Sequence, residues 1–160
     1  MVDLNTKLCF SPSDVTWLAE ECERQRVGPL KVGYMAAAAA AYFWNEWWMG
    51  PPTPALIRIL GAQIEPIVNA GGFRTVNVTV GGMAGAPPSE IDRLVTTLCK
   101  ADLFPDDWYY EFERIHPFRD GNGRTGTILW NGARWRARGT VQWEHPPDHF
   151  DSRWFDKRLG

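Results

Sequence analysis

Cysteine is scarce in this chain of 160 residues, and Cys9, Cys22 and Cys99 are too far apart to form a C-x-x-C pair. An odd and sparse set of cysteines is typical of reduced thiols in a cytosolic protein. The chain also lacks the basic and apolar opening segment of a secretory signal peptide. These absences together predict a cytoplasmic location.

Long hydrophobic runs and a strong excess of charge are missing as well. The longest apolar stretch, Val32–Trp44, is too short to span a bilayer and predicts a buried helix. The formal net charge is only −2, whereas a dedicated nucleic-acid binder usually carries a basic patch. We therefore expect neither a membrane nor a nucleic acid among the partners.

The length predicts a single domain over residues 1–160, and 44% hydrophobic residues with nine tryptophans predict a well-filled core. Apolar residues recur mostly at helical spacing, which predicts a mainly α fold. One apolar stripe continues past Pro66 to Val68, so the third helix is expected to run through a kink there. The helices are predicted at about 13–26, 31–48, 54–70, 90–100, 105–115 and 122–139.

Only residues Phe73–Val80 break the helical pattern. Apolar and polar side chains alternate there with a period of two, which predicts a surface strand or hairpin. A lone strand in a helical protein leaves an unpaired edge at the surface.

The loop between the last two predicted helices, His116–Arg124, holds an unusual set of chemical groups. Gly121 and Gly123 flank an asparagine just before a helix, where converging backbone N–H groups form an anion nest. Arg124, in the first turn of that helix, would oppose the helix dipole unless an anion is bound beside it. A guanidinium binds phosphate in a bidentate way. The loop therefore predicts a phosphate site.

Two further side chains of the loop supply reactivity. Asp120 beside the nest could hold Mg²⁺, which bridges carboxylate and phosphate oxygens. His116 is a natural general base at neutral pH. Each feature alone is commoner in turns and structural loops, and Asp-Gly-Asn-Gly also occurs in calcium loops. An EF-hand would need further acidic residues, which Arg124 and Thr125 do not provide.

The same loop resembles the signature of the Fic family, H-x-F-x-[D/E]-G-N-G-R-x-x-R. The resemblance extends over about residues 53–138 and implies the Fic fold, a helical bundle with a short β-hairpin flap before the motif. The positions that match the signature are His116, Phe118, Asp120, Gly121, Asn122, Gly123 and Arg124.

What the resemblance implies is an adenylyltransferase that moves AMP, or another nucleoside monophosphate, from ATP or another triphosphate to a Ser, Thr or Tyr hydroxyl of a target protein. His116 would be the base, Asp120 the Mg²⁺ ligand, Gly121–Gly123 the phosphate cradle with Asn122 as support, and Arg124 the clamp on the leaving group. Pro117 and Phe118 would stiffen and anchor the loop. The flap residues Thr75, Val76, Asn77, Val78 and Thr79 would bind the target by strand addition.

The sequence departs from the family in two places. Thr127 stands where the second arginine of the signature is expected, which leaves the binding of the ATP terminal phosphate open. The inhibitory motif of the family, S/T-x-x-x-E followed by Gly or Asn, is also missing: Thr16–Glu20 and Thr140–Glu144 are followed by other residues. We therefore hypothesise that no such clamp acts in cis, and a separate antitoxin-like inhibitor stays an open alternative.

Other chemistry on the same loop is an alternative to AMP transfer. Doc-type toxin kinases carry lysine where Gly123 stands, so this glycine favours the transferase orientation. Phosphocholine transfer, removal of AMP and a non-catalytic nucleotide-binding module are the remaining alternatives, because one fold serves several reactions.

Overall fold

The computed structural model describes residues 12–139 and 142–147. These residues form six α-helices, two short 3₁₀ helices and one two-stranded antiparallel sheet, which confirms the mainly α fold with a short hairpin. The elements are α1 (Pro12–Arg24), α2 (Lys31–Trp44), η2 (Trp47–Met49), α3 (Pro54–Ile64), β1 (Thr79–Val80), β2 (Met83–Ala84), η3 (Pro88–Glu90), α4 (Ile91–Lys100), α5 (Pro105–Ile115) and α6 (Asn122–Arg138).

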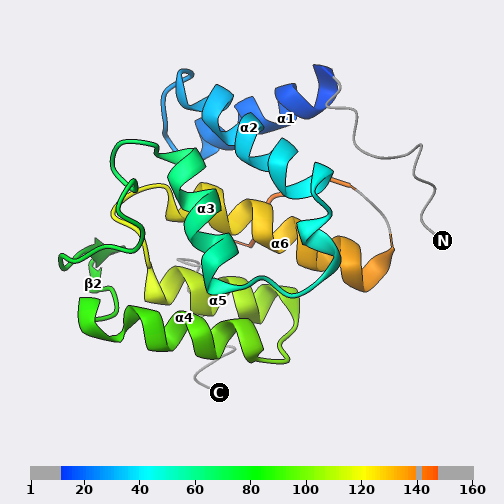
Figure 1. Cartoon of the computed structure of the whole chain (residues 1–160). Helices are drawn as coiled ribbons and strands as arrows, with labels where there is room; N and C mark the ends of the chain where they lie inside the picture. The colour runs from blue at the N-terminus through cyan, green and yellow to red at the C-terminus, as the bar shows by residue number, and fades with distance from the viewer. Residues whose placement is uncertain (1–11, 140–141, 148–160) are drawn as a thin grey trace.

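Helix α6 is the centre of the molecule. In Figure 1, α1 and α2 lie above it, α4 and α5 lie below it, and α3 crosses beside it. Twelve of its seventeen residues are buried, and it packs against α5, α3 and η2. A helix that is buried nearly all round needs small or apolar residues on most faces, and Gly126, Thr127 and Gly132 allow neighbouring helices to approach closely.

Several tryptophans fill the core around α6, as the composition predicts. Trp108, Trp130 and Trp135 are buried, and the ring of Trp135 lies 4.2 Å from that of Phe43 on α2. Trp44, by contrast, is 62% exposed, so high tryptophan content does not translate into burial at every position.

Helix α3 is shorter than the sequence pattern predicts. It ends at Ile64, and the expected kinked continuation to Val68 is wrong: Ile67 is 90% exposed. Pro66 explains the end of the helix, because a proline disfavours the helical conformation of the residue before it. Accordingly, Glu65 leaves the helical region, with φ −130° and ψ 81°.

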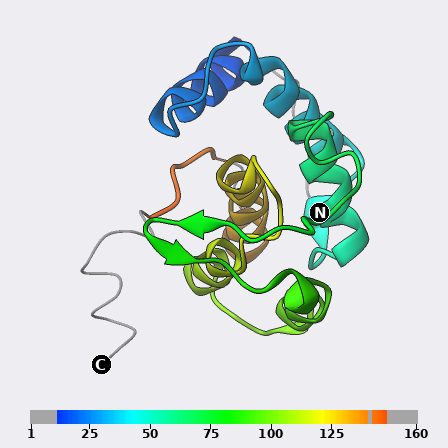
Figure 2. The ribbon, with the colours of Figure 1, turned by 90° about the vertical axis from the view of Figure 1, so that its left-hand side faces the viewer.

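The predicted strand Phe73–Val80 is also wrong for most of its length. Only its last two residues form β1, which pairs with β2 across a two-residue turn. Gly81 and Gly82 both have positive φ (53° and 80°), as a type I′ hairpin turn requires. Figure 2 shows this hairpin in front of the near ends of α5 and α6.

Phe118 fixes the loop before α6 to the core. Its side chain is fully buried and its ring makes an edge contact with Phe73 at a centroid distance of 5.4 Å. The ring lies directly on Gly61 of α3, where a Cβ atom would come within 2.2 Å of the ring. Glycine at this position is therefore a condition for anchoring the loop.

Gly61→Ala is expected to lower the free energy of unfolding by about 1–3 kcal/mol, the usual cost of overpacking a core. Thermal or urea unfolding measures the change. Gly33→Ala is the matched control, since nothing lies within 4 Å of its Cβ position in α2, and alanine there should be neutral or stabilising. Equal effects of the two substitutions would contradict the close contact with Phe118.

Candidate active site

His116 lies at the C-terminal end of α5 in a left-handed backbone conformation (φ 54°, ψ 63°). A non-glycine residue in this region is uncommon, so the surroundings must hold it there. Its ring Nδ1 is 3.3 Å from the carbonyl oxygen of Glu113. Because a carbonyl only accepts, Nδ1 carries the proton and Nε2 keeps its lone pair. Nε2 is therefore the atom that can accept a proton.

The surroundings of His116 keep its imidazole neutral. Burial lowers its pKa, and the charge of Arg74 acts in the same direction. The hydrogen bond to the Glu113 carbonyl and the charge of Asp120 oppose this change, but the net pKa is below the ordinary value of 6.5. A neutral imidazole at pH 7 suits a general base.

Glu113 brings a second titratable group to the histidine. Its carboxyl group is 2% exposed, and one of its oxygens lies 3.8 Å from Nδ1 of His116. Burial raises the pKa of Glu113 to about 8, even though the charge of Arg24 opposes the change. The carboxyl group next to the histidine is therefore mostly protonated at neutral pH.

The turn Asp120–Asn122 shapes the N-terminus of α6. Gly121 is the N-terminal cap, with φ 77°, and makes no side-chain cap bond. Asp120 is 60% exposed and its Oδ1 accepts the N–H of Gly121 at 2.7 Å. Asn122 bonds both the N–H and the C=O of Phe118 at 2.8 Å. The loop is thus closed on itself, while the first turn of α6 offers its N–H groups to an anion.

Arg124 is 1% exposed and lies beside this turn. Its Nη2 donates to Glu65 at 2.7 Å and is 3.6 Å from the Asp120 carboxylate. Nη1 is buried and has no hydrogen-bond partner in the described part of the chain. The same Glu65 also binds Lys31 at 2.7 Å. Arg124 is therefore not a free surface cation, but its buried Nη1 has no partner among the described residues.

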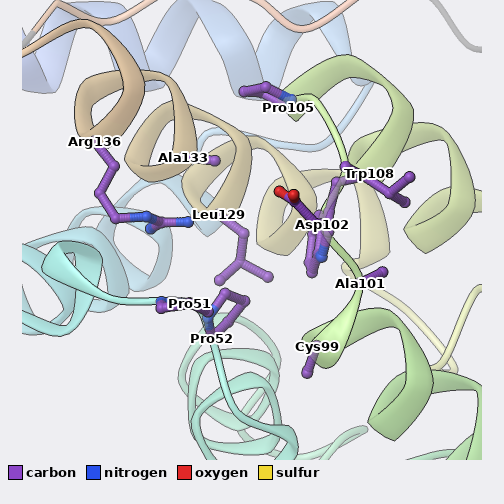
Figure 3. A pocket seen from close by; sticks show the side chains of 11 residues that line it. Pro51, Pro52, Cys99, Ala101, Asp102, Pro105, Trp108, Leu129, Ala133 and Arg136 are labelled. Atoms are coloured by element: carbon purple, nitrogen blue, oxygen red, sulfur yellow. The ribbon is translucent and has the colours of Figure 1, made fainter.

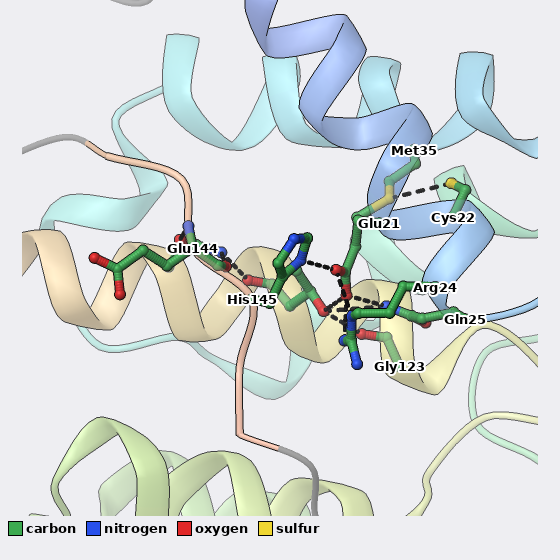
Figure 4. Close-up of polar contacts among 10 residues, drawn as sticks. Glu21, Cys22, Arg24, Gln25, Met35, Gly123, Glu144 and His145 are labelled. Carbon is green, nitrogen blue, oxygen red and sulfur yellow. Dashed lines mark hydrogen bonds and ion pairs between the residues drawn. The ribbon is translucent and has the colours of Figure 1, made fainter.

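Helix α1 covers the other side of this turn. Gln25 occupies the space beside Gly123, where a Cβ would come within 2.4 Å of its side-chain oxygen. Glu21 is fully buried and binds Arg24 from its own helix and Gln25, which directly follows that helix. Thr127 stands where the family signature has its second arginine. Its hydroxyl donates to the Glu21 carboxylate at 3.1 Å. Figure 4 shows Glu21, Arg24 and Gln25 gathered beside Gly123.

The carboxylate of Glu21 is held in its charged form. Burial alone would raise its pKa, but hydrogen bonds from Arg24, Gln25 and His145 outweigh this, and the pKa lies below its ordinary value. His145 also stacks on Trp17 of α1, with ring centroids 4.9 Å apart. Residues 142–147 thus pack against α1 close to the site.

The predicted flap residues lie beside the site, but most of them are not in a strand. Thr75, Val76 and Asn77 are exposed in the segment before the hairpin, and only Thr79 belongs to β1. Val78 accepts the N–H of Gly85, so its backbone pairs with the returning chain.

A separate cavity of about 230 Å³ lies towards the other end of α6 (Figure 3). Its lining contains Pro51, Asp102, Trp108 and Arg136 and shares no residue with the loop His116–Arg124. It is therefore not part of the candidate active site.

Sequence reasoning found the loop but missed its partners. Glu21, Glu65, Arg74 and Glu113 carry no motif that would single them out. For the three glutamates, the one signal is a charged residue inside a helical pattern; Arg74 stands in the alternating segment and has no such signal. Their roles depend on contacts with residues far away in the chain.

A family model described as the Fic/DOC family matches residues 52–132, which contain the hairpin, the loop and most of α6. The chain belongs to the Fic/DOC family. The match covers α3, the hairpin, α4, α5 and the loop His116–Arg124, whereas α1 and α2 lie outside it.

Relatives of this Fic protein include insect proteins named Protein adenylyltransferase Fic. Those of Drosophila melanogaster and Drosophila persimilis are 34% identical over 91 residues, which is 50% of this chain and 18% of each relative. That of Aedes aegypti is 33% identical over 108 residues, 59% of this chain and 21% of the relative. The chain thus matches about a fifth of each relative.

No group of three or more His, Cys, Asp or Glu side chains could hold a metal ion within residues 12–139 and 142–147. None of the helices described there is long and apolar enough to cross a membrane. A metal at Asp120 would therefore need ligands from a bound molecule or water.

Glu113→Gln is expected to stabilise the protein at pH 8 and to have little effect near pH 4.5. Between its ordinary pKa of 4.5 and its folded pKa of about 8, Glu113 keeps a proton in the folded state that the unfolded chain releases. Stability therefore falls as the pH rises through this window. Glutamine removes that loss, so the variant's melting temperature should be several degrees higher at pH 8.

Thermal unfolding at several pH values measures this effect. Glu111→Gln on the same helix is the control, because its side chain is 25% exposed and paired with Arg114. If the melting temperature of Glu113→Gln equals that of the unchanged protein at both pH values, the pKa of Glu113 is not raised in the folded state.

Proposed function

We propose that this Fic protein transfers AMP, or another nucleoside monophosphate, from a nucleoside triphosphate to a hydroxyl group of a target protein. The observation that carries the proposal is the buried guanidinium of Arg124 in the first turn of α6, whose Nη1 has no hydrogen-bond partner within residues 12–139 and 142–147. A buried donor without a partner costs free energy unless a ligand satisfies it. A phosphate oxygen is the natural ligand for this donor and for the adjacent N–H groups.

The chemistry starts with His116. Nε2 accepts the proton of the target hydroxyl, and the hydroxyl oxygen then forms a bond to the α-phosphorus. The bond between the α-phosphorus and the bridging oxygen breaks, and pyrophosphate leaves with the electron pair. The lowered pKa of His116 supports this role, because the imidazole is neutral before the reaction.

The phosphates of the donor would lie against Gly121–Gly123. Neither glycine presents a side chain, and Gly121 has the positive φ that turns the backbone N–H groups inwards. Arg124 adds positive charge close to the leaving pyrophosphate, and its pairing with Glu65 holds its geometry before the substrate arrives.

Mg²⁺ fits at Asp120. Its carboxylate is exposed and lies next to the nest, whereas Glu65 and Glu21 are buried in ion pairs. Magnesium usually binds through one or two carboxylates together with substrate phosphates and water. When bound, the ion would neutralise phosphate charge, and Asp120 would hold it.

The target would bind along the segment from Thr75 to β1, opposite His116. Thr75, Val76 and Asn77 are exposed there, and in the described sheet β1 pairs with β2 on one edge, so that its other edge can take an extended peptide. A peptide bound in this way would bring a hydroxyl side chain to the imidazole. The name of the insect relatives, which refers to adenylyl transfer to proteins, supports this class of substrate.

His116→Ala is expected to lower the rate of label transfer from α-labelled ATP to protein by about 10²–10⁴-fold, the usual contribution of a general base. Labelled ATP, Mg²⁺ and a lysate are incubated with each variant. Arg114→Ala, an exposed substitution on the same helix, serves as the control and should keep the full rate. Transfer of the γ-label instead of the α-label would replace AMP transfer with a kinase reaction, and no transfer of either label would refute both.

Asp120→Asn is expected to raise the Mg²⁺ concentration needed for half-maximal rate by at least about tenfold, since it removes the charge of the metal ligand. The measurement is the transfer rate at increasing Mg²⁺, with chelator as the zero point. Asp92→Asn is the control, because that carboxylate is exposed on α4. An unchanged Mg²⁺ requirement would exclude Asp120 as the ligand.

A further inference from the structure

Arg74 is a buried arginine whose side chain binds backbone oxygen atoms. Its side chain makes four hydrogen bonds to carbonyl groups, and the residue is 5% exposed. Nε donates to His116 at 2.7 Å, Nη1 to Val76 at 2.8 Å, and Nη2 to Ala86 at 2.7 Å and to Ile115 at 3.1 Å. One guanidinium thus joins the segment before the hairpin, the segment after it and the end of α5.

Two of these carbonyls belong to the end of α5. The last carbonyls of a helix have no partner within the helix, and they carry the negative end of the helix dipole. Arg74 satisfies those of Ile115 and His116, and its positive charge suits this end of α5. The buried charge is therefore compensated by backbone dipoles.

The same contacts hold the strained backbone of His116. Its φ of 54° is unfavourable for a residue with a side chain, and such strain persists only when the surroundings impose it. Arg74 binds the carbonyl of His116 through its side chain and that of Pro117 through its own N–H, at 2.9 Å. The direction of the imidazole follows from this backbone conformation.

The other two carbonyls belong to the two stems of the hairpin. Val76 precedes β1 and Ala86 follows β2, and the N–H of Ala86 also binds the carbonyl of Ile115 at 3.3 Å. Gly85 makes room for the guanidinium, because a Cβ there would lie 2.9 Å from Nη2 of Arg74. The guanidinium of Arg74 thus binds both stems of the hairpin and the carbonyl of His116.

We propose that Arg74 is a positioning residue that couples the hairpin to His116, so that a target bound at the hairpin meets an imidazole already aimed at its hydroxyl. The effect of this role on catalysis rests on the proposed function. The coupling itself rests on the four side-chain hydrogen bonds of Arg74, to which the N–H of Ala86 adds one bond to the carbonyl of Ile115. Arg74 contacts the backbone and not the reacting atoms, and it acts through the residues that it holds.

The test is Arg74→Lys, which keeps the positive charge and loses the planar fork. An ammonium group cannot bind the four carbonyls in the same geometry. We expect kcat to fall by about 10–100-fold, the cost of a small misplacement of a catalytic group. The KM for the nucleotide should stay within about twofold, because the phosphate nest is made by other residues. The amides of Gly85 and Ala86 should exchange hydrogen faster.

Arg93→Lys is the matched control, since Arg93 is exposed on α4 and paired with Glu90. It should change neither kcat nor amide exchange. If Arg74→Lys does not fold, Gly85→Ala takes its place, because its Cβ displaces the guanidinium from the side of the hairpin. The same loss of kcat at constant nucleotide KM is expected.

Two results would overturn the proposal. One is an unchanged kcat and unchanged exchange in Arg74→Lys. The other is a loss of kcat with an equal loss of nucleotide binding, which would make Arg74 a general structural residue. If the unchanged protein transfers no label but Arg74→Lys still speeds exchange at Gly85 and Ala86, the coupling stands and the proposed function fails.

Discussion

The site depends on the buried ion pair between Glu65 and Arg124. A guanidinium in the first turn of a helix opposes the dipole, and a buried one without a partner is strongly destabilising. Glu65 balances it, and Lys31 binds the other carboxylate oxygen. Burial alone would raise the pKa of Glu65, but hydrogen bonds from Lys31 and Arg124 outweigh it, so the pair stays ionised. One carboxylate therefore fixes α2, the end of α3 and the start of α6.

The early end of α3 makes this pair available. Pro66 forces Glu65 out of the helix, so its carboxylate turns towards Arg124, 59 residues away in the chain. Asn69, in the turn that follows, donates from its amide to the carbonyls of Gly61 and Asp120. The end of α3 and the loop before α6 thus support each other, and the loop does not depend on its glycines alone.

The sequence predicts the loop well because its chemistry is local. Two glycines, an asparagine and a following helix predict the turn at Gly121–Gly123 from consecutive residues, without knowledge of the contacts that support it. The partners of the loop are not local, and no periodicity reveals them. The prediction of a strand over Phe73–Val80 is wrong for the same reason, since it ignores contacts with distant residues. Phe73 packs on Phe118 and Arg74 binds the end of α5, so tertiary contacts override the alternating pattern.

Thr127 is the departure from the family signature whose consequence is clearest in the structure. An arginine at position 127 would place a positive charge of α6 next to the buried carboxylate of Glu21 on α1. With threonine, the charge of Glu21 is met by Arg24, three residues further along α1, while Thr127 contributes a neutral hydroxyl. A pair formed within one helix does not hold that helix to another. The contact between the α1 region and α6 at this point therefore consists of a neutral hydrogen bond from Gln25 to Thr127 and a hydrogen bond from the Thr127 hydroxyl to the Glu21 carboxylate. Both are weaker than a buried pair of full charges across the interface.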